Sequence, residues 1–132
     1  MDGRGRLRIL AVDDDARTLE TLEFFLEVDG HEIYTASRGH EAVKVARRLR
    51  RERKRVDLSI LDYHMPDQTG IDTFLQLSSE LPGLEAVFVT GEVSETVERG
   101  ISEVGGLALV PKPVDLIRMR TVIDEFRRRM LT

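Results

Sequence analysis

The sequence contains no cysteine and no tryptophan, and aromatic residues make up only 5% of its 132 positions. Without cysteine, the chain can form neither a disulfide framework nor a metal site with thiolate ligands. Its three histidines are too scattered for a zinc site, and we expect His31 and His40 at the surface. No apolar run is as long as a membrane span or the core of a signal peptide, which predicts a cytoplasmic protein without membrane contact.

Positive charge is scarce outside two short segments. Eight of the 20 lysines and arginines lie between Lys44 and Arg55, where Glu52 is the only acid, and residues 127–129 are three more arginines. The formal net charge of the whole chain is −4, so the remainder is distinctly acidic and predicts no direct binding to nucleic acid. The basic segments are typical of solvated helix ends, where cations suit the helix dipole. Docking of an acidic partner by residues 47–55 is the alternative.

Short apolar runs alternate with amphipathic patterns along a chain of single-domain length. Five runs predict strands at residues 8–12, 32–36, 57–61, 85–89 and 107–110. Most are continuously apolar, as in parallel strands that are covered on both faces. Apolar residues spaced by three or four predict helices marked by residues 19–26, 42–49, 69–77, 93–104 and 116–130. Five such units predict an α/β, doubly wound (βα)5 sandwich, preceded by a disordered lead-in at residues 1–6.

Polar residues that an apolar core does not require stand at the carboxyl ends of four predicted strands. These are Asp13 and Asp14, then Asp62, Thr90 and Lys112. Because the carboxyl ends of parallel strands share one edge of the sheet, where open α/β folds bind ligands, we expect these side chains to converge. Carboxylates about 4 Å apart repel by roughly 4 kcal/mol at an effective dielectric near 20, so the cluster needs a counter-charge. Oxygen ligands favour Mg²⁺, and an ammonium and a hydroxyl group opposite it suit a phosphoryl group.

Lys112 is held in a stiff segment, because it stands between Pro111 and Pro113. Pro113 restricts the backbone of Lys112 to extended conformations, and the Lys112–Pro113 bond is a candidate cis peptide. Pro111 lacks an N–H group, so we expect the last strand to end there. This rigid setting indicates that the ammonium group must point at one place.

With these motifs at these strand ends, the sequence resembles the receiver domain of two-component response regulators, in the CheY-like superfamily. The resemblance covers essentially residues 7–131. It rests on VDDD at the end of the first predicted strand, LDYHMPDQTG after the third, VTG after the fourth and PKP after the fifth. It implies a flavodoxin-like fold with a five-stranded parallel sheet in the order 2-1-3-4-5.

The resemblance also implies a role for each residue of the cluster. Asp62 would be the phosphoacceptor, and Asp14 would bind Mg²⁺ directly while Asp13 binds it mainly through water. The backbone carbonyl of His64 would be a third ligand of the metal.

Residues beyond the acidic cluster are implied to act on the phosphoryl group. Thr90 and Lys112 would contact it directly. His64 and Glu92 would flank it and set its lifetime by screening the acyl phosphate from water, while Gly91 leaves the approach open.

Some positions depart from the family's usual pattern. Leu109 stands where many receivers carry a tyrosine or phenylalanine switch, and Val114 where phenylalanine is frequent. Gln68 and Thr69 replace the common Met-Asp pair, although Thr69 can still cap the third helix.

The implied function is a switch rather than an enzyme with an external substrate. A histidine kinase or histidine phosphotransfer protein would pass its phosphoryl group to Asp62 with Mg²⁺, and the new charge would alter binding to a downstream protein. The aspartyl phosphate would then be lost by autodephosphorylation. A homodimer through the face of the fourth and fifth helices is left open.

Two alternatives are a haloacid-dehalogenase-like phosphohydrolase and a degenerate receiver that acts as a constitutive interaction module. The phosphohydrolase family also places aspartates after its first strand, and Asp13 and Asp15 have the right spacing. That family, however, has threonine or valine where Arg17 stands. A degenerate receiver is disfavoured because every chemical position is filled.

Overall fold

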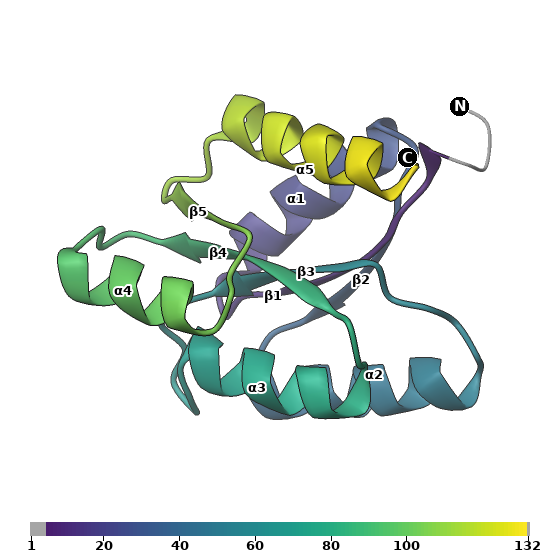
Figure 1. Ribbon diagram of the computed structural model, residues 1–132, viewed down its shortest axis with the longest axis horizontal. Coiled ribbons are helices and arrows are strands. Elements are labelled where there is room, and N and C mark those ends of the chain that lie inside the picture. Colours follow the sequence, from purple (N-terminus) through teal and green to yellow (C-terminus); the bar gives the residue numbers. More distant parts are fainter. Residues whose placement is uncertain (1–4, 132) are drawn as a thin grey trace.

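Five parallel strands alternate with five helices, as the sequence predicts. The computed structural model describes residues 5–131 (Figure 1), so most of the expected lead-in at residues 1–6 lies outside the described residues. The elements are β1 (Arg8–Val12), α1 (Ala16–Val28), β2 (Glu32–Ala36), α2 (Gly39–Arg51), β3 (Leu58–Asp62), α3 (Gly70–Glu80), β4 (Glu85–Thr90), α4 (Glu95–Glu103), β5 (Ala108–Pro111) and α5 (Leu116–Met130). Strands β3, β4 and β5 each end one residue later than predicted, so Asp62 and Thr90 are strand residues.

The strands form one sheet in the order β2-β1-β3-β4-β5, which confirms the predicted topology. All neighbouring strands are parallel, and β1 and β3 lie side by side where the strand order reverses. In this pair Val12 is opposite Leu61, so the next residues, Asp13 after β1 and Asp62 at the end of β3, lie at the same level of the sheet. Pairing of β1 with β3 therefore brings two aspartates that are 49 positions apart in sequence to one place.

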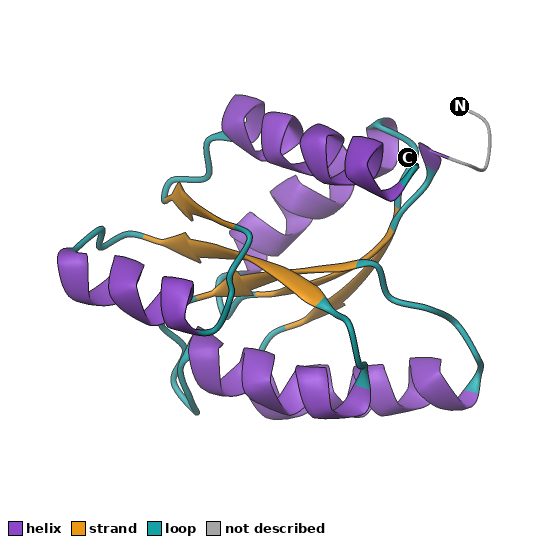
Figure 2. Ribbon diagram, viewed as in Figure 1, coloured by secondary structure: helices purple, strands orange, loops and turns teal. Residues whose placement is uncertain are grey.

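Helices cover both faces of the sheet. Helices α1 and α5 lie on one face, and α2, α3 and α4 lie on the other (Figure 2). Because side chains alternate along a strand, β1 contributes to both layers. Leu10 and Val12 pack in the core between the sheet and α2, α3 and α4, whereas Ile9 and Ala11 pack in the core between the sheet and α1 and α5.

Side-chain caps determine where most of the helices begin. Asp15 accepts a hydrogen bond from the Arg17 N–H at the start of α1. Ser94 and Asp115 cap α4 and α5 in the same way, so α4 begins after Ser94 rather than at residue 93. These caps satisfy N–H groups that have no partner within the helix. Within residues 5–131, no helix is long and apolar enough to cross a bilayer.

His31 is buried, so the expected surface position is wrong for this residue, while His40 is exposed as expected. The His31 ring closes the space between the turn after α1 and the start of β1, and its Nδ1 accepts a hydrogen bond from the Leu7 N–H at 3.1 Å. Burial, with a smaller contribution from the charge of Arg127, lowers the pKa of His31. The ring is held neutral because a protonated Nδ1 could not accept this bond.

Candidate functional site

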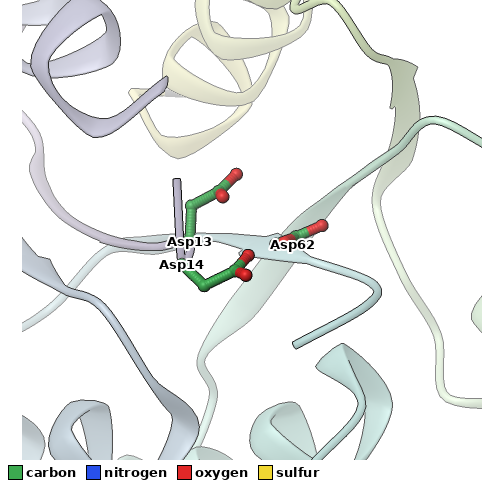
Figure 3. Close-up of side chains that lie close together, drawn as sticks. All are labelled: Asp13, Asp14 and Asp62. Carbon is green, nitrogen blue, oxygen red and sulfur yellow. The ribbon is translucent and has the colours of Figure 1, made fainter. Parts of the chain in front are cut away.

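Three carboxylates meet at the carboxyl edge of the sheet (Figure 3). Asp13 and Asp14 follow β1, and Asp62 is the last residue of β3; one oxygen from each lies within 4.8 Å of the others. Asp13 and Asp62 are only 2% and 4% exposed, whereas Asp14 is open to solvent. The cluster thus has a buried floor and one accessible edge.

Lys112 supplies positive charge to this cluster from the end of β5. Its Nζ lies 2.9 Å from Asp13 Oδ2 and 3.3 Å from Asp62 Oδ2. The Lys112 N–H donates to the Thr90 carbonyl at 2.8 Å, which holds the backbone behind the side chain, and the Lys112–Pro113 peptide is cis. The strand ends at Pro111, and the ammonium group points into the acidic cluster as the sequence predicts.

One ammonium group does not fully compensate the carboxylates. Burial, followed by the charge of Asp13, raises the pKa of Asp62 to about 7, against the opposing effect of Lys112. Desolvation works against the charged form of Lys112, but its hydrogen bond to Asp13 and the charges of Asp13 and Asp62 prevail and raise its pKa. The site therefore favours additional positive charge.

The donor set fits a hard divalent cation. Two carboxylates after β1 and one at the end of β3 offer oxygen ligands only, which is the chemistry that Mg²⁺ prefers. The raised pKa of Asp62 is a second indication, because burial first and the charge of Asp13 second disfavour its carboxylate unless positive charge lies beside it.

Thr90 is the last residue of β4 and is fully buried. Its hydroxyl donates to the Glu92 carbonyl and its oxygen accepts from the Glu92 N–H, both at 3.1 Å. The hydroxyl thus closes the turn after β4 instead of bonding to the carboxylates. Thr90 lies at the same sheet edge as the cluster, and the Lys112 N–H bonds to its carbonyl.

Two exposed side chains meet across the loops that follow β3 and β4. His64 Nε2 lies 3.5 Å from Glu92 Oε2, and the backbone N–H of His64 is 3.4 Å from Asp62 Oδ1. Gly91 leaves space beside them, because an added Cβ there would meet only the Lys112 Cβ at 3.9 Å. The pair links the two loops that border the acidic cluster.

Gly70 is required by a close approach of the chain to itself. A Cβ at this position would lie 2.4 Å from the backbone oxygen of Asp62, and the Gly70 N–H donates to the Tyr63 carbonyl at 2.8 Å. The start of α3 therefore packs directly on the end of β3. Thr69 caps this helix with a capping box that includes Asp72, as predicted for Thr69.

Asp67 is a contributor that sequence reasoning missed. Helix α2 begins after Arg38, whose side chain makes no cap. The Asp67 carboxylate instead accepts from the Gly39 N–H at 3.3 Å and the His40 N–H at 3.1 Å. An arginine where a capping residue is preferred was the available signal that another segment must cap α2.

Gln68 anchors the same loop to α3. Its Nε2 donates to Thr73 Oγ1 at 2.7 Å and to Gln76 Oε1 at 3.1 Å. A Cβ at Gly39 would lie only 2.2 Å from this nitrogen, so the first residue of α2 leaves room for Gln68. Residues 63–69 are therefore held at both α2 and α3, which fixes the backbone that follows Asp62.

Comparisons with known proteins agree on one family. Residues 9–124 match the family described as the response regulator receiver domain. The chain is 33% identical over 121 residues to the probable transcriptional regulatory protein TcrX of Mycobacterium tuberculosis, an alignment that covers 87% of this chain and 49% of TcrX. It is 35% identical over 129 residues to the two-component response regulator ORR24 of Oryza sativa, covering 93% of this chain and 19% of ORR24. The chain thus spans half or less of these relatives.

A solved structure shows the same fold. The non-phosphorylated receiver domain of HemR from Leptospira biflexa superposes with a TM-score of 0.80 at 27% identity, over 92% of this chain and 94% of that one.

Proposed function

This chain belongs to the response regulator receiver domain family of two-component systems, and from this premise we propose that Asp62 is its phosphoacceptor. The observation that carries the proposal is the convergence of Asp13, Asp14 and Asp62 with the Lys112 ammonium group at one edge of the sheet. Asp13 and Asp62 are both buried and both contact Lys112, and Asp62 is the one that ends the central strand β3. The other two lie where they can hold a cation beside it.

The proposed reaction transfers a phosphoryl group from a phosphohistidine. A carboxylate oxygen of Asp62 attacks phosphorus, the bond from phosphorus to the histidine nitrogen breaks, and an aspartyl phosphate forms. Bound Mg²⁺ would supply positive charge for the phosphoryl oxygens, with Asp13, Asp14, Asp62 and the His64 carbonyl as its ligands.

Lys112 and Thr90 then hold the product. The Lys112 ammonium group, which contacts Asp62 at 3.3 Å, is within reach of a phosphoryl group on that residue. The Thr90 hydroxyl can donate to a phosphoryl oxygen by rotating away from the Glu92 carbonyl. The near-complete burial of Asp62 limits the approach of water to the acyl bond.

His64 and Glu92 are proposed to set the lifetime of the aspartyl phosphate. Their side chains meet at 3.5 Å from two loops that border the site, while Gly91 leaves the approach open. His64→Ala and Glu92→Ala should each change the rate of dephosphorylation, followed by phosphoprotein gel electrophoresis. Decay at the wild-type rate in both variants would contradict the screening role.

The phosphoryl donor and the downstream protein partner of this chain are proposed from its family. Receiver domains interact with kinases and downstream effectors, and for this chain we propose a histidine kinase or phosphotransfer protein in the cytoplasm as donor. Its output is a change in binding to a protein target, with no turnover of an external substrate. The family match over residues 9–124 does not favour the phosphohydrolase alternative. The filled positions of the acidic cluster argue against a degenerate receiver.

The test is phosphorylation with a small donor. Wild-type protein incubated with Mg²⁺ and acetyl phosphate should gain the mass of one phosphate, measured on the intact protein. Asp62→Asn should gain none, and chelation of Mg²⁺ should abolish labelling of the wild type. A phosphate that persists in Asp62→Asn, or steady hydrolysis of a phosphate ester, would overturn the assignment.

A further inference from the structure

The carboxyl end of α2 carries a concentration of positive charge that the phosphoacceptor site does not use. Eight basic residues and one acid give residues 44–55 a formal charge of +7, which leaves −11 for the rest of the chain. We call the exposed side chains of Arg50, Arg51, Arg53, Lys54 and Arg55 the basic surface. It precedes β3, so it lies at the sheet edge opposite Asp62, which ends that strand.

Ordinary helix-end electrostatics explain only part of this charge. Arg48, Arg50 and Arg51 lie in the last turn of α2, where cations interact favourably with the helix dipole. Arg53, Lys54 and Arg55, in contrast, come after the helix. Within residues 5–131, neither Arg51 nor Arg53 has a carboxylate partner within 4.0 Å, while Lys54 pairs with a neighbour, Glu52, at 3.4 Å. Two guanidinium groups are therefore available to another molecule.

Arg53 keeps its charge at a position that favours glycine. The N–H of Lys54 donates to the Leu49 carbonyl at 2.9 Å and that of Arg53 to the Arg50 carbonyl at 3.0 Å, the two bonds of a Schellman motif. Arg53 occupies the left-handed position of this motif, and it is the one described residue other than glycine with positive φ, 59°. A strained arginine with an unpaired charge indicates that the side chain has a use beyond folding.

A pocket beside these cations combines charge with apolar surface. It has a volume of about 510 Å³ and lies between the end of α2 and the turn from α3 to β4. Four cations of the basic surface, Arg50, Arg53, Lys54 and Arg55, line it together with the partly exposed Leu81 and the exposed Pro82. Glu80 at its edge shows which chemistry fits, because its carboxylate bonds to Arg47 at 2.8 Å and to Arg50 at 2.7 Å.

We propose that the basic surface docks an acidic peptide segment of a partner protein. Carboxylates of the segment pair with Arg51 and Arg53 as Glu80 pairs with Arg50, and an apolar side chain of the segment enters the pocket against Leu81 and Pro82. An extended polyanion such as duplex DNA fits less well, because it would also face the acidic remainder of the molecule. Since Asp62 lies at the opposite edge, docking leaves the phosphoacceptor accessible.

The test uses the full chain and a fluorescein-labelled synthetic peptide of glutamates that flank two leucines. Fluorescence anisotropy should show binding that weakens as salt is added. Arg51→Gln combined with Arg53→Gly should bind on the order of tenfold more weakly. Arg53→Gly alone removes one charge and relieves the strained backbone, so weaker binding by this variant at an unchanged or higher melting temperature does not come from unfolding. Arg128→Gln, the loss of one exposed arginine on α5, is its matched control and should bind like the wild type.

The following results would contradict the proposal. Absence of binding, or equal weakening by Arg128→Gln, would show that the basic surface is only a solvated helix end. Tighter binding of duplex DNA or of vesicles containing phosphatidylserine than of the peptide would assign the surface to another class of partner. Asp62→Asn should bind the peptide normally, so this result is independent of whether Asp62 is the phosphoacceptor.

Discussion

Lys112 and Asp62 contact each other, but the site disfavours the charged form of Asp62 and favours the charged form of Lys112. Asp62 is a buried carboxylate that faces a second one, and burial together with Asp13 raises its pKa to about 7. Lys112 is the cation that makes the pair of carboxylates tolerable. A functional arrangement of this kind lowers stability until a cation binds, because the carboxylates are placed for a ligand and not for each other.

Substitutions of these two residues should therefore change stability in opposite directions. In the presence of a chelator, Asp62→Asn removes one of the repelling charges and should raise the free energy of unfolding by about 1–2 kcal/mol. Lys112→Met leaves Asp13 and Asp62 without their counter-charge and should lower it by about 1–3 kcal/mol. Urea unfolding of the three proteins measures both values. Two changes of the same sign would show that repulsion does not dominate the site.

Arg53 offers a similar contrast outside the site. Its left-handed backbone costs an L-residue with a side chain about 1 kcal/mol relative to glycine. Arg53→Gly should therefore raise the melting temperature, and Arg53→Ala, which keeps the strain and loses the charge, should not. A lower melting temperature for Arg53→Gly would mean that the arginine side chain itself stabilises the fold.

The start of helix α2 is capped by a residue from the loop that follows β3. Its first N–H groups are capped by Asp67, which belongs to the loop between Asp62 and α3. The cap therefore joins the start of a helix to the backbone beside Asp62, the proposed phosphoacceptor. Movement of this loop on phosphorylation would be felt at α2 as well as at α3, to which Gln68 is bonded.

Removal of this cap should affect both stability and phosphorylation. Asp67→Ala should lower the free energy of unfolding by about 1 kcal/mol, the usual value of a helix cap, and should slow labelling by acetyl phosphate because the loop after Asp62 is less restrained. Asp67→Asn, whose single carbonyl oxygen can accept only one of the two hydrogen bonds, should restore labelling and stability in part. Labelling as slow in Asp67→Asn as in Asp67→Ala would show that the carboxylate charge matters and not the remaining hydrogen bond.

The first and last residues of some helices and strands follow from their local sequence, whereas those of others do not. Asp15, Thr69 and Ser94 each precede the helix that they cap, so local patterns locate the starts of α1, α3 and α4. The start of α2 does not follow from local pattern, because its cap comes from residue 67. The strands β3, β4 and β5 were each predicted to end one residue early, because their last residues are polar or proline and apolar runs do not include them.

The arrangement of the whole molecule explains why the acidic cluster could be predicted and His31 could not. Parallel strands in the order β2-β1-β3-β4-β5 place all carboxyl ends on one edge, so strand-end polarity alone locates Asp13, Asp62 and Lys112. His31 is buried by packing between the turn after α1, the first residues before β1 and α5, which no local pattern reveals. Roles of the site residues in phosphoryl transfer remain predictions.

His31 should make the stability of the whole domain depend on pH. Its ring faces Asp29 beside it, Asp124 and Arg127 from α5, and Arg6, and burial is the largest cause that lowers its pKa. The unfolded chain protonates this histidine near its ordinary pKa of 6.5, whereas the folded chain does so only at lower pH. At His31 the unfolded state therefore binds more protons below about pH 6.5, so the contribution of this residue to stability falls as the pH is lowered from there towards its depressed folded-state pKa. The raised pKa of Asp62 contributes in the opposite direction over the same range.

Substitution of His31 by a residue that does not titrate should remove this dependence. His31→Asn places an oxygen where Nδ1 accepts from the Leu7 N–H, so it keeps the hydrogen bond and loses the titration. In urea unfolding between about pH 7 and pH 5, the free energy of unfolding of the wild type should fall relative to that of His31→Asn as the pH is lowered, because Asp62 titrates in both proteins. His40→Asn, a change at an exposed histidine, should follow the wild type. Parallel curves for all three proteins would mean that carboxylates, and not His31, govern stability in this range.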